Sequence, residues 1–332
     1  MIQESTTLPV VRAADLEEPR EDRRWLIDTL WARAGVGIVG GALKCCKSWL
    51  GLDMAVSTAS ATRCLGAFPV VEPGGVLIYM AEDSAGVIKA RLAGLCRHRG
   101  LDLATLPIDV ITAVSVRLDL EGDQRRLAET VRQRAPRMLL LDPFVRLHRI
   151  DENHAGDVSA ILAYLRALQR GHDLAVVVVH HARKNGPAGV QAGQGLRGSG
   201  DFHAWGDSNL YLRRQQSQLV LTVEHRAAPA PEPISLVLAQ GESGDDAHLE
   251  IVGGPAAAVG EPSGAGSEIG EAILRALDQA NAPLQRGELR AAVRVRNERL
   301  GDALQRLAAS GTIQRRGEGW VRAETGVPIP PG

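Results

Sequence analysis

From Val36 onward, short aliphatic segments alternate with segments of helical periodicity, and this alternation constrains the fold more than any other feature. The aliphatic segments are almost continuously apolar, as in strands that are buried on both faces. Strands of this kind, each followed by a helix, form a parallel sheet covered by helices on both sides. The expected strands are 36–40, 75–80, 108–114, 138–141 and 174–179, and the expected helices are 48–61, 84–98, 123–134 and 156–170.

The pattern changes after His181. A glycine-rich polar loop over 184–200 is followed by short segments that alternate apolar and polar residues. This alternation is typical of half-buried strands, and it predicts an antiparallel extension of the sheet. The expected strands of the extension are 209–214, 218–226, 234–239 and 248–252.

The chain is expected to divide into two folded parts. A flexible arm over 1–24 precedes an α/β domain over 25–253, in which 25–31 forms a cap. Residues 254–266 are nearly all Gly, Pro, Ala or Ser and are typical of a linker. Three short helical segments (268–279, 287–292 and 298–309) and a hairpin follow, the order found in a winged helix-turn-helix. This second domain is expected over 267–322, with a tail over 323–332.

Composition excludes several classes of protein. The net charge is −1, so the chain cannot coat nucleic acid by bulk charge. The longest strictly apolar run is only six residues, at 174–179, and the charged first 24 residues contain no apolar core, so we expect neither a membrane span nor a secretory signal. The four cysteines form no C-x-x-C pair, and we expect reduced thiols and a cytoplasmic location.

A phosphate-binding loop is predicted between the first strand and its helix. Gly41, Lys47 and Ser48 fit the spacing G-x-x-x-x-G-K-[S/T], in which backbone N–H groups and the Lys ammonium hold phosphates and the hydroxyl binds Mg²⁺. Only four of the 38 cationic residues are lysines, and Lys44 and Lys47 both lie in this loop. Cys46 occupies the position where the pattern requires glycine, and its Cβ would crowd the backbone against the phosphates.

Acidic residues follow two further strands. Glu82 comes just after the strand 75–80, at the edge where open α/β sheets place ligands, and could deprotonate a water aimed at a γ-phosphate. Asp83 could instead cap the next helix. Asp142 ends the hydrophobic strand 138–141, in the form of a Walker B carboxylate at the Mg²⁺ site.

Two histidines and an arginine complete the candidate site. His180 and His181 end another strand, and because adjacent strand residues point to opposite faces, only one of them can face a nucleotide. Arg197 lies near the end of the glycine-rich loop. It could be a solvated charge or an arginine finger that reaches a neighbouring subunit.

These motifs together resemble the RecA-like P-loop ATPases of the RepA type, which are related to hexameric replicative helicases. The resemblance covers about 25–240 and rests on G-x-x-K-x-x-K-S-W-L (41–50), A-E-D (81–83), L-L-L-D-P (139–143), H-H-x-R-K (180–184) and L-R-G-S (196–199). It implies a RecA-like ATPase domain with ATP and Mg²⁺ as cofactors and a ring, most plausibly a homo-hexamer, with DNA in its interior.

The resemblance also implies a role for each site residue. Glu82 would be the catalytic base, His181 rather than His180 the γ-phosphate sensor, and Arg197 the finger. Ser48 and Asp142 would bind the metal. The loop residues Gly41, Lys44, Cys45, Cys46, Lys47, Ser48 and Trp49 would bind the nucleotide.

The C-terminal part gives a separate indication of DNA binding. Residues 286–322 contain nine arginines against four acids, with Arg315 and Arg316 in the expected wing. Such a basic face is typical of phosphate contacts, although a solvated face of a protein-binding winged helix would look the same. Two functions therefore stay open: an ATP-driven DNA helicase or loader, and a non-motor regulator in which ATP binding switches DNA binding or assembly while turnover is slow.

Overall fold

The computed structural model describes residues 10–16, 24–152, 155–181, 199–215, 218–240, 246–252, 264–280, 283–285, 287–289, 304, 307, 312–316 and 319–322. The chain forms two compact units, Met1–Gly254 and Pro255–Gly332.

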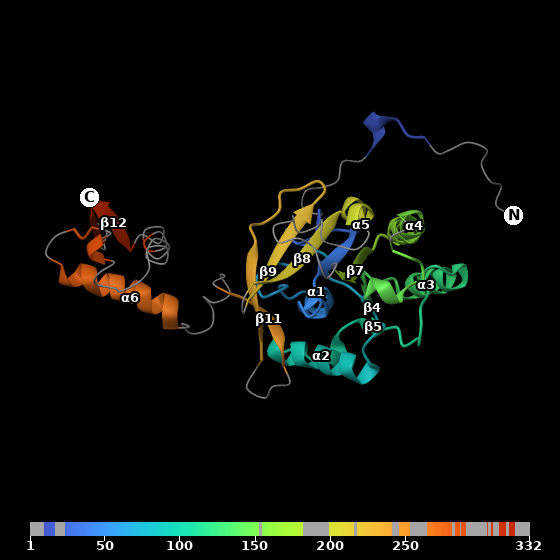
Figure 1. Ribbon diagram of the computed structural model, residues 1–332, viewed down its shortest axis with the longest axis horizontal. Helices are drawn as coiled ribbons and strands as arrows, with labels where there is room; N and C mark the ends of the chain where they lie inside the picture. The colour runs from blue at the N-terminus through green and yellow to red at the C-terminus, as the bar shows by residue number, and fades with distance from the viewer. Residues whose placement is uncertain are drawn as a thin grey trace, which may run out of the picture. The chain divides into compact units, whose positions relative to one another are not determined.

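A nine-stranded mixed sheet forms the centre of the first unit (Figure 1). Its strand order is β11-β10-β9-β8-β3-β7-β6-β4-β5. The strands from β8 to β5 run parallel, and β9, β10 and β11 extend the sheet in antiparallel pairing. Their bounds are β3 (Val36–Gly41), β4 (Val76–Met80), β5 (Ile108–Val110), β6 (Met138–Asp142), β7 (Ala175–His181), β8 (Ser208–Gln215), β9 (Gln218–His225), β10 (Ile234–Ala239) and β11 (His248–Ile251).

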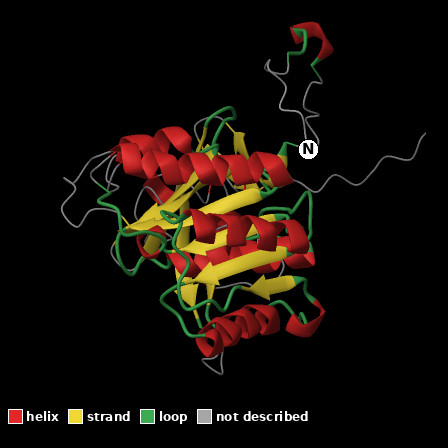
Figure 2. Ribbon diagram, turned by 90° about the vertical axis from the view of Figure 1, so that its right-hand side faces the viewer, coloured by secondary structure: helices red, strands yellow, loops and turns green. Residues whose placement is uncertain are grey.

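Helices cover both faces of this sheet, as Figure 2 shows. The helices α1 (Lys47–Ser60) and α2 (Ala85–His98) pack on one face, together with Val177 and Val179 of β7. The helices α3 (Glu121–Arg134), α4 (Ala155–His172) and α5 (Ser199–Trp205) lie on the other face, together with Val176 and Val178. Alternate residues of one strand thus enter two separate cores, which explains why the strands are apolar throughout. The expected mixed α/β architecture with an antiparallel extension is confirmed.

The topology brings four strand ends to one edge of the sheet. The chain runs outward from β3 to β4 and then to the edge strand β5. It returns through β6 and β7, which lie between β4 and β3, and then crosses to β8 on the other side of β3. Parallel strands place all their carboxyl ends at the same edge, and open α/β sheets bind ligands where the strand order reverses in this way. Gly41, Glu82, Asp142 and His181 lie at or just beyond these ends.

Two local expectations need correction, and a third gains detail. The strand expected over 108–114 ends at Val110, because β5 lies at the edge of the sheet and pairs with β4 only from Ile108 to Val110. The segment 25–31, expected as a cap, belongs to a small antiparallel hairpin of β1 (Trp25–Ile27) and β2 (Trp31–Ala32). The predicted loop 184–200 gives way at Ser199 to the unpredicted helix α5. A short 3-10 helix, η1 (Ala13–Asp15), lies in the N-terminal arm.

The second unit contains α6 (Gly264–Gln279) and a hairpin of β12 (Ile313–Arg316) and β13 (Gly319–Arg322). Its core includes Ile273, Leu277, Leu289, Leu304 and Ile313. Most of the two further helices expected over 287–292 and 298–309 lies outside the described residues, so the winged helix stays a prediction. Within the described parts of the chain, no helix is both long and apolar enough to cross a membrane.

Candidate functional site

The loop between β3 and α1 begins at a position that only glycine can occupy. Gly41 has a φ of +151°, and a Cβ built there would lie 2.2 Å from the carbonyl oxygen of Leu212 on β8. Since Gly41 and Leu212 are paired in neighbouring parallel strands, a side chain would force β3 and β8 apart. The first glycine of the motif thus serves the packing of the sheet as well as the turn.

Cys46 takes a left-handed conformation where the motif requires glycine. Its φ and ψ are 58° and 26°, and Lys44 also has a positive φ of 62°. Such angles are uncommon for residues with a Cβ and carry a cost of order 1 kcal/mol each. Cys46 is half-buried and Cys45 is almost fully buried, and both thiols pack against the core on the α1 face. Burial raises the pKa of the Cys46 thiol, which favours its protonated form.

Lys47 is the first residue of α1 and is buried, with only 4% of its surface exposed. Its Nζ donates a hydrogen bond to the carbonyl oxygen of Ala42 at 2.6 Å, so the ammonium lies across its own loop. Burial lowers the pKa of Lys47. The side chain of the N-cap residue Cys46 makes no capping hydrogen bond, so it leaves the first backbone N–H groups of α1 available to an anion.

A polar pocket of about 180 Å³ adjoins this loop. Its polar lining consists of Ser48, Glu82, Asp83, Arg91 and Asp142. Three carboxylates from two strand ends therefore line one pocket together with Ser48. Carboxylate and hydroxyl oxygens of this kind can contribute ligands to a divalent cation that also binds phosphate oxygens, and a carboxylate can accept a proton from water.

Asp142 is the most perturbed carboxyl group of the pocket. Burial raises the pKa of Asp142 to about 6, against a hydrogen bond from Ser48 and the charge of Lys47, which lower it. Its Oδ2 is buried and has no hydrogen-bond partner among the described residues. An orphaned carboxylate oxygen beside a hydroxyl fits the coordination of Mg²⁺, so Ser48 and Asp142 are the residues that would hold the ion.

The protein alone supplies few ligands for such an ion. Within the described residues, no group of three or more His, Cys, Asp or Glu side chains is arranged to bind a metal. This fits Mg²⁺, which usually keeps waters and phosphate oxygens in its coordination sphere.

The two histidines at the end of β7 point to opposite faces of the sheet. His180 is 1% exposed and stacks on Phe202 of α5, with ring centroids 4.3 Å apart and planes at 21°. His181 lies on the α1 face, where burial and the charge of Lys47 lower its pKa to about 4. A neutral imidazole near Lys47 can donate a hydrogen bond to a phosphate oxygen. The strand pattern alone left open which histidine faces a nucleotide, and this arrangement favours His181.

Arginines that were not singled out in the sequence hold parts of the site. Arg91 of α2 donates to Asp83 at 2.6 Å and lies over the ring of Trp49 at 5.5 Å. Arg214, near the end of β8, donates to the carbonyl oxygen of Lys44 at 3.1 Å. Arg146 pairs with Glu82. The partners are 8, 170 and 64 positions apart in the chain, so no local motif reveals these pairings.

Two other expectations are resolved differently. Asp83 does not cap α2, because the side chain of Ser84 accepts the hydrogen bond from the backbone N–H of Val87. Arg197, the expected finger, lies outside the described residues.

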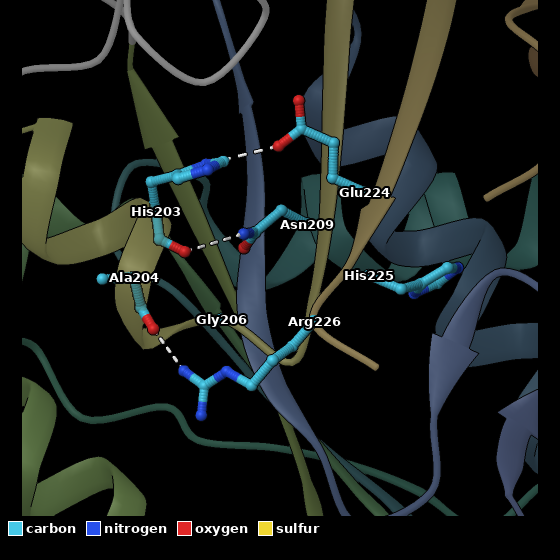
Figure 3. A pocket seen from close by; sticks show the side chains of 7 residues that line it. All are labelled: His203, Ala204, Gly206, Asn209, Glu224, His225 and Arg226. Carbon is cyan, nitrogen blue, oxygen red and sulfur yellow. Dashed lines mark hydrogen bonds and ion pairs between the residues drawn. The ribbon is translucent and has the colours of Figure 1, made fainter. Parts of the chain in front are cut away.

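A second polar pocket, of about 450 Å³, lies at the opposite edge of the sheet (Figure 3). It is formed by α5, the start of β8 and the end of β9, and none of the predicted site residues lines it. His203 Nδ1 lies 3.3 Å from Glu224 Oε2, and Asn209 donates to the carbonyl oxygen of His203 at 3.3 Å. Arg226 donates to the carbonyl oxygen of Ala204. These polar groups contact one another within the pocket.

Comparison with known proteins gives one family match. Residues 3–187, more than half of the chain, match the family described as an AAA domain. Among solved structures, the crystal structure of the RadB recombinase matches with a TM-score of 0.46 at 16% sequence identity, covering 66% of this chain and 91% of that chain. A search of curated proteins finds no match.

Proposed function

Because the chain belongs to the family of AAA domains, we propose that it binds and hydrolyses MgATP. The observation that carries this proposal is that four strand ends lie at one edge of the sheet, two of them at one polar pocket. Lys47 begins the helix after β3, and Glu82, Asp142 and His181 lie at or just beyond the ends of β4, β6 and β7. Glu82 and Asp142 line the pocket together with Ser48. Lysine, metal ligand, base and phosphate sensor are the set of groups that phosphoryl transfer to water requires.

Each residue has a separate task in this proposal. Lys47 would leave the Ala42 carbonyl oxygen and bind the phosphates of ATP, while Ser48 and Asp142 would hold Mg²⁺, which would supply positive charge to stabilise the phosphoryl group in transfer. Glu82 orients a water and accepts its proton as the water attacks the γ-phosphorus. Neutral His181 donates a hydrogen bond to the γ-phosphate.

We further propose a RecA-like ATPase of the RepA type that acts on DNA, as a helicase or loader. The motif set of residues 41–199 supports this assignment, and so does the basic segment 286–322. The proposed assembly is a ring, most plausibly a homo-hexamer, in which Arg197 of one subunit reaches the nucleotide of the next. The winged helix would bind DNA or a replication partner.

The test measures MgATP binding and hydrolysis separately. Lys47→Ala should weaken binding and lower kcat by roughly a hundredfold or more, because the phosphates lose their cation. Glu82→Gln should keep MgATP affinity and lose turnover, because a base acts only in the transition state. Asp142→Asn should impair both. Hydrolysis by Lys47→Ala at the parent rate would contradict the proposed function.

The left-handed Cys46 supports a second candidate, an ATP-switched regulator of DNA binding or assembly with slow turnover. A Cβ at this position restricts how closely the backbone can approach the phosphates. Under this alternative, Cys46→Gly should raise kcat several-fold while the parent turns over slowly with and without DNA. A parent enzyme that DNA stimulates strongly, and that Cys46→Gly does not improve, supports the helicase or loader instead.

A further inference from the structure

The candidate base Glu82 is held by an arginine from a different strand end. Arg146 Nε donates a hydrogen bond to Glu82 Oε1 at 2.8 Å. The two residues are separated by 64 positions in the chain, so the pairing is a product of the fold. Glu82 lines the pocket beside Asp142, whereas Arg146 reaches it from outside.

Arg146 extends from a turn that the core anchors firmly. The turn is the 3-10 helix η4 (Phe144–Arg146), which directly follows the metal-site strand β6 and Pro143. Phe144 is fully buried, and its ring meets Phe202 edge-on at 4.9 Å and His148 at 4.6 Å. It also meets the ring of His180 edge-on at 5.7 Å. Four rings thus fix the backbone from which Arg146 projects.

The base itself has no comparable anchor. The side chain of Glu82 is 48% exposed and follows the end of β4. An exposed carboxylate rotates freely, and rotation removes the alignment on which proton abstraction depends. A hydrogen bond to one carboxylate oxygen, from an arm that starts at a rigid turn, limits that rotation and leaves the other oxygen available.

We propose that Arg146 is a positioning residue for Glu82, which rests on the ATPase function proposed above. Its Nε–H holds Oε1, and Oε2 accepts the proton of the attacking water. The water oxygen forms the new bond to the γ-phosphorus. The bond from that phosphorus to the bridging oxygen breaks, and its electron pair leaves with ADP. Arg146 takes no proton and touches no reacting atom.

Arg91 contrasts with Arg146 in position. It lines the pocket, holds Asp83 and lies over Trp49, so its removal would disturb several contacts of the loop at once. Arg146 has an exposed side chain, 61% accessible, and its replacement leaves the buried Phe144 in place. It is therefore the arginine whose effect on the base can be measured cleanly.

The first measurement compares Arg146→Ala with the parent in steady-state hydrolysis and MgATP titration. We expect kcat to fall about tenfold, within the range that misalignment of a catalytic group produces, while KM, MgATP affinity and melting temperature stay at parent values. Arg146→Lys should recover part of the loss, because it restores a donor without the fork of the guanidinium. Arg149→Ala, which removes an exposed arginine three residues later, is the matched control and should behave as the parent.

The second measurement adds Arg146→Ala to the Glu82→Gln background. If Arg146 acts only through Glu82, its replacement should cause no further loss of rate in this background. The single-turnover rates of Glu82→Gln and of the double variant should therefore agree. A tenfold further loss in that background overturns the proposal, and so does an unchanged kcat of Arg146→Ala alone. Loss of MgATP affinity or of melting temperature also overturns it, in favour of a structural role. If the parent hydrolyses no ATP, the proposed function fails first and this inference with it, an outcome that the parent assay alone identifies.

Discussion

The carboxyl group of Asp142 is buried next to two other acidic residues, and this placement works against folding at neutral pH. Burial raises the pKa of Asp142 to about 6, above the ordinary value of 3.8. The folded chain therefore binds this proton more tightly than the unfolded chain. The resulting stabilisation is fully present below about pH 4 and is lost as the pH rises through about 6.

Asp142→Asn should therefore stabilise the nucleotide-free protein while it impairs MgATP binding. The neutral amide removes the buried charge, and a pKa difference of about two units corresponds to about 1–3 kcal/mol at pH 8. Urea unfolding of parent and variant without Mg²⁺ checks this, with an advantage for the variant that is larger at pH 8 than at pH 5. An equal difference in unfolding free energy at both pH values would show that titration of Asp142 is not its cause.

Single residues differ in how far the sequence reveals them. The places of Gly41 and Asp142 at strand ends and of Lys47 at a helix start could be predicted, because each belongs to a motif of fixed spacing next to a recognisable strand, while their roles stay predictions. Which of His180 and His181 lies on the α1 face follows only from the structure, in which His180 stacks on Phe202 on the other face of β7. Sequence alone could not settle it, since strand alternation tells that two neighbours differ but not which face holds the nucleotide.

At the scale of elements, α1 and α2 are joined by a nearly buried ion pair. Asp53 of α1 has a side chain only 2% exposed, and its Oδ2 accepts from Arg99, just past α2, at 2.5 Å. Its Oδ1 accepts from the backbone N–H of Leu65 at 2.8 Å. Both helices border the candidate site, since α1 begins with Lys47 and α2 begins shortly after Glu82. The ion pair therefore holds these two helices in position next to each other.

Asp53→Ala should lower the free energy of unfolding by about 3–5 kcal/mol, because the N–H of Leu65 loses its acceptor and the guanidinium of Arg99 loses its buried counter-charge and keeps only the hydroxyls of Ser57 and Thr62. Asp53→Asn keeps an acceptor and should lose less. The control is Glu121→Ala, which removes an exposed helical pair with Arg125 and should change stability by at most about 0.5 kcal/mol. Urea denaturation measures all three, and a loss in Asp53→Ala no greater than in Glu121→Ala would contradict the assigned role.

Elements with strong apolar periodicity were predicted well, and those without it were not. The parallel strands and helices of the first unit lie close to the expected positions, because burial on both faces leaves an unambiguous pattern. Helix α5 was missed because it begins with Ser199 and Gly200, at the end of a glycine-rich segment. Its formation depends on Phe202, which is fully buried against Phe144 and His180. Tertiary packing therefore overrides the local propensity.

At the scale of the whole molecule, the residues proposed for ATP hydrolysis and those proposed for DNA binding lie in different compact units. The first contains every described residue of the candidate ATP site, and the second contains the whole basic segment 286–322. The hairpin of β12 and β13 presents Arg315 and Arg316 as exposed side chains. If DNA is bound by the second unit, affinity and ATP turnover can be altered independently.

Replacement of Arg315 and Arg316 together by Gln should therefore weaken DNA binding without changing turnover in the absence of DNA. Each lost phosphate contact should reduce the slope of log K against log salt by about 1, so the double variant should lose about 2. Fluorescence anisotropy of labelled duplex DNA over a range of salt concentrations measures the slope in the full-length chain. The matched control replaces Arg125 and Arg126 on α3, two exposed arginines of the first unit. Equal losses in both double variants would mean that the hairpin makes no particular contact and that general charge governs binding.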